Sequence, residues 1–294
     1  MAGIYVKDNG VWKLPKSVWV KSGGTWRVCQ NAYVNNKGYW QEMMKTVTLT
    51  SSKQNFNLWE YVGSPTEPLS LIFNIESDVE IGSDTPTLPQ WCPYWCSTTR
   101  TNIPKRTASF TVGNFPAGST VIINNNGYIT GGGGYGGAGG NSFAQGSGRK
   151  VDHGFAGGAG GDAITKGSTN SFDCTLVNTG TIAGGGGGGG GAGSEYFEIG
   201  TIVSPGSAVG GSGGDGAGIT GFSRTQGGPS SANTDNYTKS TDGGNGGNLG
   251  APGVKGKSGY YPQHYGGAGG QPGKAVNASG IEVAVYGNII GVVG

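Results

Sequence analysis

Few residues in this chain combine a type and a spacing that would support catalysis or metal binding. The adjacent pair Asp152-His153 is a candidate acid–base pair, but neighbouring loop residues of this kind are usually solvated. Cys92 and Cys96 are separated by three residues, which fits neither a thioredoxin-type redox pair nor a zinc-ribbon spacing. No hydrolase triad and no pair of carboxylates can be assembled from the rest. We therefore expect a protein that is not an enzyme and needs no metal or cofactor.

The cysteine pair and the glycine-rich sequence both have interpretations that involve no catalysis. Cys92 and Cys96 are either idle thiols or a local disulfide, and the sequence leaves both open. Nucleotide-binding glycine loops require a strand, a defined glycine spacing and a helix. No helical period occurs anywhere in the chain, so we expect an all-β protein without α-helices.

Glycine divides the chain into two parts. Of the 64 glycines, 10 precede residue 131 and 54 lie in the last 164 residues. The front part has enough Trp, Tyr, Val and Ile for a small β core, whereas the rear part has few large side chains to bury. A net charge of +2 is too small to indicate that the chain as a whole binds nucleic acid. Without a membrane-spanning apolar run or a signal-peptide pattern, we expect synthesis in a cytoplasm and no membrane insertion.

A unit of 14 residues occurs three times near the N-terminus. Each copy has an aromatic residue followed by Val, a turn rich in Asn, Ser or Gly, and a short strand that ends in Trp and a polar residue. Asn9-Gly10 and Gly23-Gly24 supply the positive φ that tight hairpin turns require. The regular step predicts three linked β-hairpins within residues 1–45, in copies that start at Tyr5, Trp19 and Tyr33.

These hairpins are both aromatic and basic, with seven Lys/Arg against Asp8 and Glu42 in the first 45 residues. Such a segment could bind single-stranded nucleic acid, but the regular spacing favours hairpin packing. A single hairpin is marginal in water, so the three must stack on each other or dock on a partner. We predict docking, with a self-contained spacer as the alternative. The residues assigned to attachment are Trp12, Trp19, Trp26 and Trp40.

Residues 46–130 alternate as β-strands do and form the predicted second domain. Clusters of Pro, Gly and Asn separate its strands. The stretch 86–104, with Trp91 and Trp95, is predicted to be a long loop that packs across the domain or contacts a neighbouring chain. The candidate strands are 46–50, 69–75, 79–81, 109–112 and 120–124.

The predicted third domain, residues 131–294, contains a recurring Gly-Gly-X-Gly-Gly core, and collagen is excluded because the Gly-X-Y period is absent. A polyproline-II-type helix has three residues per turn and no internal hydrogen bonds, so its N–H and C=O groups must bond to neighbouring helices. Only glycine allows such close packing on every side. We predict a packed bundle of these helices with the unbroken run 184–191 as its most buried member, rather than a disordered linker.

A second repeat favours packing over disorder. Residues 126–131 and 179–184 each lead from a β-branched stretch directly into a glycine run, and residues 286–291 have the same pattern. A flexible linker has no reason to keep this order. We predict that these β pieces form a sheet-like platform at one end of the glycine bundle.

The organisation resembles that of the receptor-recognising adhesins at the tips of T-even-type bacteriophage long tail fibres. The matching elements are the β-rich segment, the sequence 118–130 that opens the first glycine run, and the Thr-Ile-Ala-Gly start of the polyglycine segment 181–191. The resemblance covers roughly residues 46–294. It does not include the hairpin repeats, although similar units occur in other phage tail proteins.

The resemblance implies a virion protein with a sandwich of polyglycine-II helices. Its connecting loops would touch an outer-membrane protein or lipopolysaccharide of the host, and its attachment region would cap the distal tip of a trimeric tail fibre. From the small net charge we expect no nucleic-acid partner. The candidate loops are 141–156, 194–209, 219–242 and 251–265.

The order of the glycine runs predicts which loops are distal to the platform. If each run crosses the bundle once, the outward runs are 131–140, 184–193 and 243–250. The loops 141–156, 194–209 and 251–265 are then distal, whereas 219–242 is proximal unless it hides another crossing.

The distal loops are rich in aromatic residues, which dominate interface hot spots because they bury a large area at a small entropic cost. The alternative is that part of them folds back to cap the bundle. Two other functions stay open: a structural or assembly protein of the fibre, and an ice-binding or silk-like polyglycine protein, which would have short uniform turns. The predicted receptor-binding residues are Phe143, Arg149, Phe155, Tyr196, Phe197, Tyr260, Tyr261, His264 and Tyr265.

Overall fold

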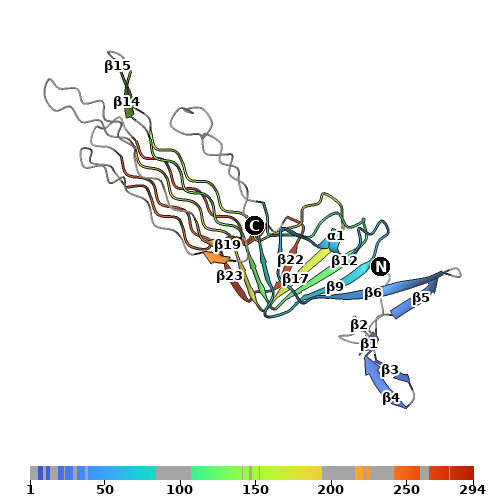
Figure 1. Cartoon of the computed structure of the whole chain (residues 1–294). Helices are drawn as coiled ribbons and strands as arrows, with labels where there is room; N and C mark the ends of the chain where they lie inside the picture. The colour runs from blue at the N-terminus through green and yellow to red at the C-terminus, as the bar shows by residue number, and fades with distance from the viewer. Residues whose placement is uncertain are drawn as a thin grey trace.

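A computed structural model shows an elongated molecule with a β platform and a bundle of glycine-rich runs (Figure 1). Backbone and side chains are described for residues 45–83, 107–140, 153–193, 216–218, 242–258, 265–277 and 279–294. Elsewhere the structure describes Gly24 and the backbone of short strands. The fold is all-β, as predicted, and the described residues include one single-turn helix, α1 (Leu58–Tyr61).

The platform consists of three sheets. The first has the order β22 (Glu282–Val285), β17 (Asp173–Asn178), β12 (Thr120–Asn125), β9 (Ser70–Ile75), β6 (Tyr39–Leu49) and β5 (Ala32–Asn36). The second has the order β23 (Asn288–Ile290), β18 (Thr181–Ala183), β13 (Tyr128–Thr130), β10 (Glu80–Gly82) and β7 (Lys53–Gln54). The third has the order β21 (Val276–Asn277), β16 (Ile164–Thr165), β11 (Phe110–Thr111) and β8 (Phe56–Asn57).

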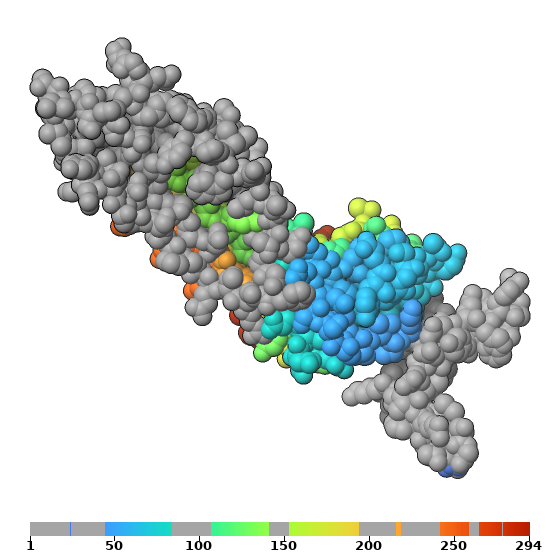
Figure 2. All heavy atoms as spheres, viewed as in Figure 1, coloured from blue at the N-terminus to red at the C-terminus, as the bar shows by residue number. Residues whose placement is uncertain are grey.

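Each complete coil of the chain contributes one strand to the first sheet, one to the second and one to the third, in that order. Every neighbouring pair of strands in them is parallel except β5 with β6. The platform is therefore a three-sided parallel β-solenoid. Its sheets combine strands from both sides of residue 130, since β12 pairs with β17 and β13 pairs with β18. In the space-filling view the first coils, drawn in blue, form one continuous face of the platform (Figure 2).

Alternate residues of the long strands fill the inside of the solenoid. In β9 and β12 every second residue is buried, and the register places Val121 beside Leu71 and Ile123 beside Phe73. This alternation is the period of two that a half-buried strand shows. The ring of Phe73 also stacks on that of Phe56, with centroids 5.6 Å apart. Stacked coils thus bury a continuous apolar core.

The predicted strands of residues 46–130 are confirmed, with shifts of one or two residues at their ends. They correspond to the second half of β6 and to β9, β10, β11 and β12. Sequence reasoning missed β7, β8 and α1 because two-residue strands and a single helical turn are too short to show a period. The predicted loop 86–104, with Cys92 and Cys96, lies outside the described residues.

The N-terminal repeats form three antiparallel hairpins, as predicted. They pair β1 (Val6–Asp8) with β2 (Val11–Lys13), β3 (Trp19–Ser22) with β4 (Thr25–Val28), and β5 with β6. β6 is eleven residues long and continues into the platform, where Lys45 pairs with Leu71 of β9. The hairpins and the glycine bundle lie on opposite sides of the platform (Figure 1).

Both glycine segments leave the solenoid at the same corner, between the second and third sheets. The first follows β13 and returns at β16, and the second follows β18 and returns at β21. Because β13 and β18 are neighbours in one sheet, the runs that follow them start side by side. The N–H of Gly131 accordingly donates to the C=O of Ala183 at 2.9 Å. The platform therefore sets the register of the bundle.

The run 184–193 is the centre of the bundle. It donates hydrogen bonds to the runs 154–161, 216–217 and 251–257, and it accepts them from 131–140, 243–250 and 266–273. Bonds recur at every third residue, the period of a polyproline-II-type helix. Residues 183–193 are all buried, whereas the long outer runs also contain partly exposed positions. The predicted packing and the predicted burial of this run are confirmed.

The central run has no room for side chains. A Cβ on Gly187 or Gly188 would lie well inside 3.0 Å of a carbonyl oxygen, that of Gly270 or Tyr135. These oxygens belong to hydrogen-bonded backbone and cannot turn away as a flexible side chain would. On the outer runs, by contrast, a residue such as Ala268 is exposed.

The direction of the run 243–250 differs from the prediction. Gly244 donates to Gly190 and Gly250 donates to Gly184, so this run is antiparallel to the central one and returns to the platform. The chain then turns, with Gly250 at φ +65°, and the run 251–257 leads outward. The expectation that the whole of 251–265 is a distal loop is therefore wrong.

The cause of this error is an additional crossing between residues 218 and 242. β19 (Gly218–Thr220) pairs with β20 (Ser223–Thr225) and lies beside β10 of the platform. Asp242, in contrast, accepts a hydrogen bond from Lys257 at the far end of the bundle. The two described flanks of this segment thus lie at opposite ends of the bundle. The prediction assumed one crossing for each glycine block and therefore placed both flanks at the same end.

Candidate binding surface at the far end of the bundle

The far end of the bundle gathers the ends of several connecting segments. The N–H of Gly140 donates to the C=O of Ala192 at 2.8 Å, close to where two connections begin. The N–H of Gly193 donates to the C=O of Lys257, and the N–H of Lys257 donates to the C=O of Asp242, both at 3.1 Å. Connections that are far apart in the sequence therefore emerge from one small face, opposite the platform (Figure 1).

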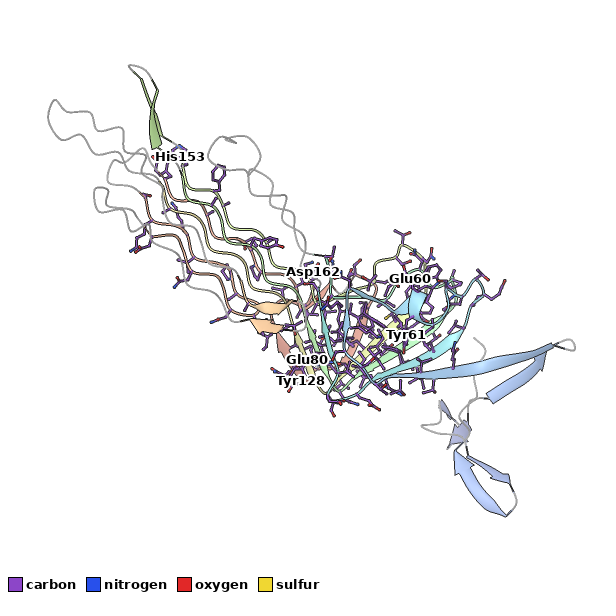
Figure 3. The ribbon with its side chains drawn as sticks, viewed as in Figure 1. Glu60, Tyr61, Glu80, Tyr128, His153 and Asp162 are labelled. Carbon is purple, nitrogen blue, oxygen red and sulfur yellow. The ribbon has the colours of Figure 1, made fainter. Side chains whose placement is uncertain are left out.

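His153 and Tyr265 join two of these connections. Nδ1 of His153 accepts a hydrogen bond from the backbone N–H of Tyr265 at 3.1 Å, and the rings stack with centroids 5.6 Å apart and planes inclined by 30°. The N–H of Gly154 donates back to the C=O of Tyr265 at 3.0 Å. Tyr265 remains 57% exposed. Figure 3 labels His153 at this end of the bundle. His153 thus holds the backbone of Tyr265 in place, whereas Asp152 lies outside the described residues.

Lys257 and Asp242 form a second connection across the face. Their side chains make an ion pair of 2.6 Å and are 67% and 43% exposed, respectively. An ion pair this exposed contributes about 0–1 kcal/mol to stability. The ion pair acts locally, because it holds Asp242, at the end of one connection, against Lys257, at the start of the next.

The connection after residue 140 forms a hairpin of β14 (Ser142–Gln145) and β15 (Gly148–Val151) that projects beyond the bundle (Figure 1). Its register pairs Phe143 with Lys150 and Ala144 with Arg149. The predicted contact residues Phe143 and Arg149 therefore lie on the two strands of one projecting hairpin, one register position apart.

The other predicted contact residues are distributed unevenly. Phe155 lies inside the run 154–161, where its N–H donates to the C=O of Ala138 at 2.9 Å, and its side chain is half-buried. Tyr265 stands at the face itself. The residues that lie outside the described part of the chain are Tyr196, Phe197, Tyr260, Tyr261 and His264.

The four predicted attachment residues lie on hairpin strands whose backbone is described. They are Trp12 in β2, Trp19 in β3, Trp26 in β4 and Trp40 in β6. The hairpins that contain these strands lie on the side of the platform away from the far-end face (Figure 1).

The described residues show no arrangement suited to metal binding. They contain no group of three or more His, Cys, Asp or Glu that could hold a metal ion. Burial raises the pKa of the Cys174 thiol to about 12, with a smaller opposing effect of Lys166, so this thiol stays protonated. Asp162, at the junction of bundle and platform (Figure 3), accepts a backbone hydrogen bond from Lys274 at 2.8 Å. In this part of the chain no helix is long and apolar enough to cross a membrane.

Sequence reasoning missed the two contacts that hold the face together. His153 and Tyr265 stand immediately before the glycine runs that return to the platform. Asp242 likewise precedes a glycine run. The polar or aromatic residue directly next to a glycine run is a signal that would have pointed to them.

The fold and this face define a class of protein: a β-solenoid that holds a rigid glycine bundle and presents connecting segments on its far end. Residues 44–294 match the family described as phage tail fibre adhesin Gp38, and the chain belongs to that family. The adhesin family expected from the sequence is thereby confirmed. Its members are virion components, and the family and fold point to a structural, non-catalytic protein.

Among solved structures, the chain is similar to the crystal structure of the gp37-gp38 adhesin tip complex of the bacteriophage S16 long tail fiber. The two are 22% identical, the match covers 86% of this chain and 82% of that chain, and the TM-score is 0.47. No curated protein matches this chain.

Proposed function

We propose that this protein is the receptor-binding adhesin at the tip of a phage tail fibre and that its far-end connections contact the surface of the host cell. The observation that carries the proposal is the gathering of connections on one face of the bundle, on the side away from the hairpins. A phage protein that is attached at one end and binds a cell at the other needs this separation of its two contact regions.

The construction of the bundle suits a surface whose sequence can change. The runs are held by backbone hydrogen bonds, so the connections contribute little to the stability of the scaffold. Binding residues are commonly placed on loops that a rigid scaffold positions. The far-end connections can therefore accept substitutions that alter recognition without unfolding the protein.

The residues of the proposed surface favour a partly anionic receptor. The β14–β15 hairpin contains Phe143, Arg149 and Lys150, and Tyr265 is exposed beside His153, two residues after the hairpin. Arg forms bidentate contacts with phosphate and carboxylate groups, and aromatic rings supply buried area. Lipopolysaccharide phosphates and the acidic loops of an outer-membrane protein both have this chemistry.

If the far end binds the host cell, the opposite end of the molecule is the part that attaches to the tail fibre. In this proposal residues 1–45 and 46–130 hold the protein on the distal tip of a trimeric fibre, with contacts through the tryptophans of the hairpins. Residues 131–294 carry the receptor-binding surface. The protein would be made in the host cytoplasm before assembly.

Binding of the purified protein to whole Gram-negative cells tests the proposal. The variant replaces Tyr260, Tyr261 and Tyr265 by Ser, and Tyr286→Ser is the matched control because Tyr286 is 65% exposed on the platform. We expect the triple variant to lose binding at an unchanged melting temperature, and the control to bind as the unmodified protein does. Binding that survives the triple change would move the site to other connections. Failure to bind any susceptible strain would favour a purely structural or assembly role.

Host strains separate the two receptor classes. Cells that lack a major porin and cells with truncated lipopolysaccharide are compared with their parent strain. If binding is lost on only one of the two mutant strains, the component that this strain lacks is the receptor. If binding is kept on both mutant strains, neither the porin nor the lipopolysaccharide is the receptor.

A further inference from the structure

At the far end of the bundle, the residues at the ends of four adjacent glycine-rich runs form one continuous row. Backbone hydrogen bonds make neighbours of the runs 154–161, 266–273, 251–257 and 243–250, in that order. The residues at their far ends are, in the same order, His153, Tyr265, Lys257 and Asp242. The row therefore brings together side chains from four separate crossings of the bundle.

Each residue of the row is held in place by a neighbour. His153 and Tyr265 stack and share a hydrogen bond, and Lys257 and Asp242 form an ion pair. The two pairs are also close to each other, because a Cβ on Gly266 would lie 2.7 Å from the carbonyl oxygen of Lys257. A residue without a Cβ is therefore required directly after Tyr265. A ligand meets a preformed surface, so little has to be ordered on binding.

The row combines one exposed aromatic ring with hydrogen-bonding groups of both kinds. The ring of Tyr265 stacks on that of His153, and Tyr265 is 57% exposed. Since Nδ1 of His153 accepts the N–H of Tyr265, the neutral imidazole has its proton on Nε2, which is a further donor. A lysine ammonium has three N–H donors and a carboxylate has two acceptor oxygens. The ion pair of Lys257 and Asp242 thus leaves both donors and acceptors for a ligand.

The charge of the row favours a neutral ligand over a phosphate. The ammonium group of Lys257 is 2.6 Å from a carboxylate oxygen of Asp242, so this pair has no excess positive charge. Phosphate binding relies on charge-assisted hydrogen bonds, and a carboxylate beside the ammonium group repels the anion. A hydroxyl group, in contrast, both donates and accepts. Two neighbouring hydroxyls of one sugar can therefore bond to the ammonium group and to the carboxylate at the same time.

We propose that this row binds a neutral sugar residue of a cell-surface glycan. The C–H face of the sugar packs on the ring of Tyr265, two of its hydroxyls bond to Lys257 and Asp242, and Nε2–H of His153 donates to a third oxygen. An aromatic ring next to polar groups suits such a ligand, because the sugar has one apolar face and a polar rim. The inference rests on the proposed function in taking the host-cell surface as the source of the glycan.

The test measures binding of the full chain to two glycans of a susceptible strain by isothermal titration calorimetry. The probes are delipidated lipopolysaccharide and capsular polysaccharide, each before and after removal of phosphate with hydrofluoric acid. We expect at least one of them to bind, and to bind equally well without its phosphates. Tyr265→Ala and Asp242→Ala should each weaken this binding by about tenfold at an unchanged melting temperature. The control is Gln271→Ala, an exposed position on the run that follows Tyr265, which should leave the affinity unchanged.

The sign of the Asp242→Ala effect is decisive. Tighter binding by this variant, or loss of binding once phosphate is removed, would identify a phosphate ligand and overturn the proposal. Unchanged affinity of Tyr265→Ala would overturn it as well, because the glycan would then bind elsewhere. If neither glycan binds a protein that still binds whole cells, the receptor is a protein and this inference fails while the proposed function stands. Failure to bind cells at all counts against the proposed function itself.

Discussion

The imidazole of His153 accepts a hydrogen bond from the backbone N–H of Tyr265, a residue 112 positions further along the chain. The two residues stand where the connections 141–152 and 259–264 rejoin the bundle, and the runs that follow them, 154–161 and 266–273, are hydrogen-bonded neighbours. A single contact between one side chain and one backbone group thus links the first and the last segment of the far-end face.

Replacement of His153 by Ala is expected to reduce cell binding strongly while it reduces the stability of the protein only slightly. The freed N–H of Tyr265 is near solvent and can bond to water, so the free energy of unfolding should fall by no more than about 1 kcal/mol. Cell binding should fall further, because the ends of two connections are no longer held together. Tyr265→Phe is the matched control, since it keeps both the ring and the N–H. Equal cell binding by His153→Ala and the unmodified protein would show that the contact has no part in recognition.

Gly188→Ala is expected to destabilise the bundle severely. Its Cβ would overlap the carbonyl oxygen of Tyr135, and the backbone on both sides is fixed by hydrogen bonds. We expect a loss of about 3 kcal/mol or failure to fold, since overpacking typically costs about 1–3 kcal/mol and this site cannot relax. Urea denaturation measures the change. Ala268→Ser, at an exposed position of an outer run, should leave the midpoint unchanged.

Asn125→Ala is expected to weaken the solenoid at one corner. Nδ2 of Asn125 donates to Oδ1 of Asn178 at 2.8 Å, and both residues are fully buried. Nδ2 of Asn178 already lacks a hydrogen-bond partner among the described residues, so the change leaves its whole amide unsatisfied. The expected cost is about 1–3 kcal/mol. The control Asn124→Ala removes a pair with Asn74 on the half-buried outer side and should cost less; equal losses would contradict the argument.

Cys174 is expected to make the protein less stable in alkali. Because burial raises the folded-state pKa of this thiol from 9.0 to about 12, folded and unfolded chains both hold the proton below pH 9. Between pH 9 and 12 the unfolded chain loses it first, so the free energy of unfolding falls as pH rises. At pH 10.5 the loss is on the order of 2 kcal/mol. Cys174→Val should show a correspondingly smaller decline between pH 8 and pH 10.5, and parallel declines in the two proteins would refute the assignment.

Local patterns in the sequence were sufficient to predict the longer elements of this fold, but not the short β7, β8 and α1. The 14-residue repeat predicted three hairpins because a hairpin is determined by its turn and by residues a few positions apart. Alternation predicted the long strands of the platform, and the absence of side chains in 184–191 predicted the centre of the bundle. The family of the protein could also be predicted, since it depends on the order of these elements along the chain.

The tertiary structure alone decided how the elements connect. The run 243–250 returns to the platform, where the sequence suggested that it leads outward. A polyglycine run has no side-chain pattern that marks its direction, and its N–H and C=O groups can bond to parallel or antiparallel neighbours. Direction is therefore set only by where the flanking segments lie, which is a non-local property of the fold.

The same distinction holds for the far-end face. Composition indicated that aromatic residues in the connections would make contacts, but not that His153 meets Tyr265 or that Lys257 meets Asp242. These pairs depend on which runs pack side by side around the central run. The sequence by itself therefore determined the kinds of element and the family, whereas hydrogen bonding between distant glycine runs decided which residues share a surface.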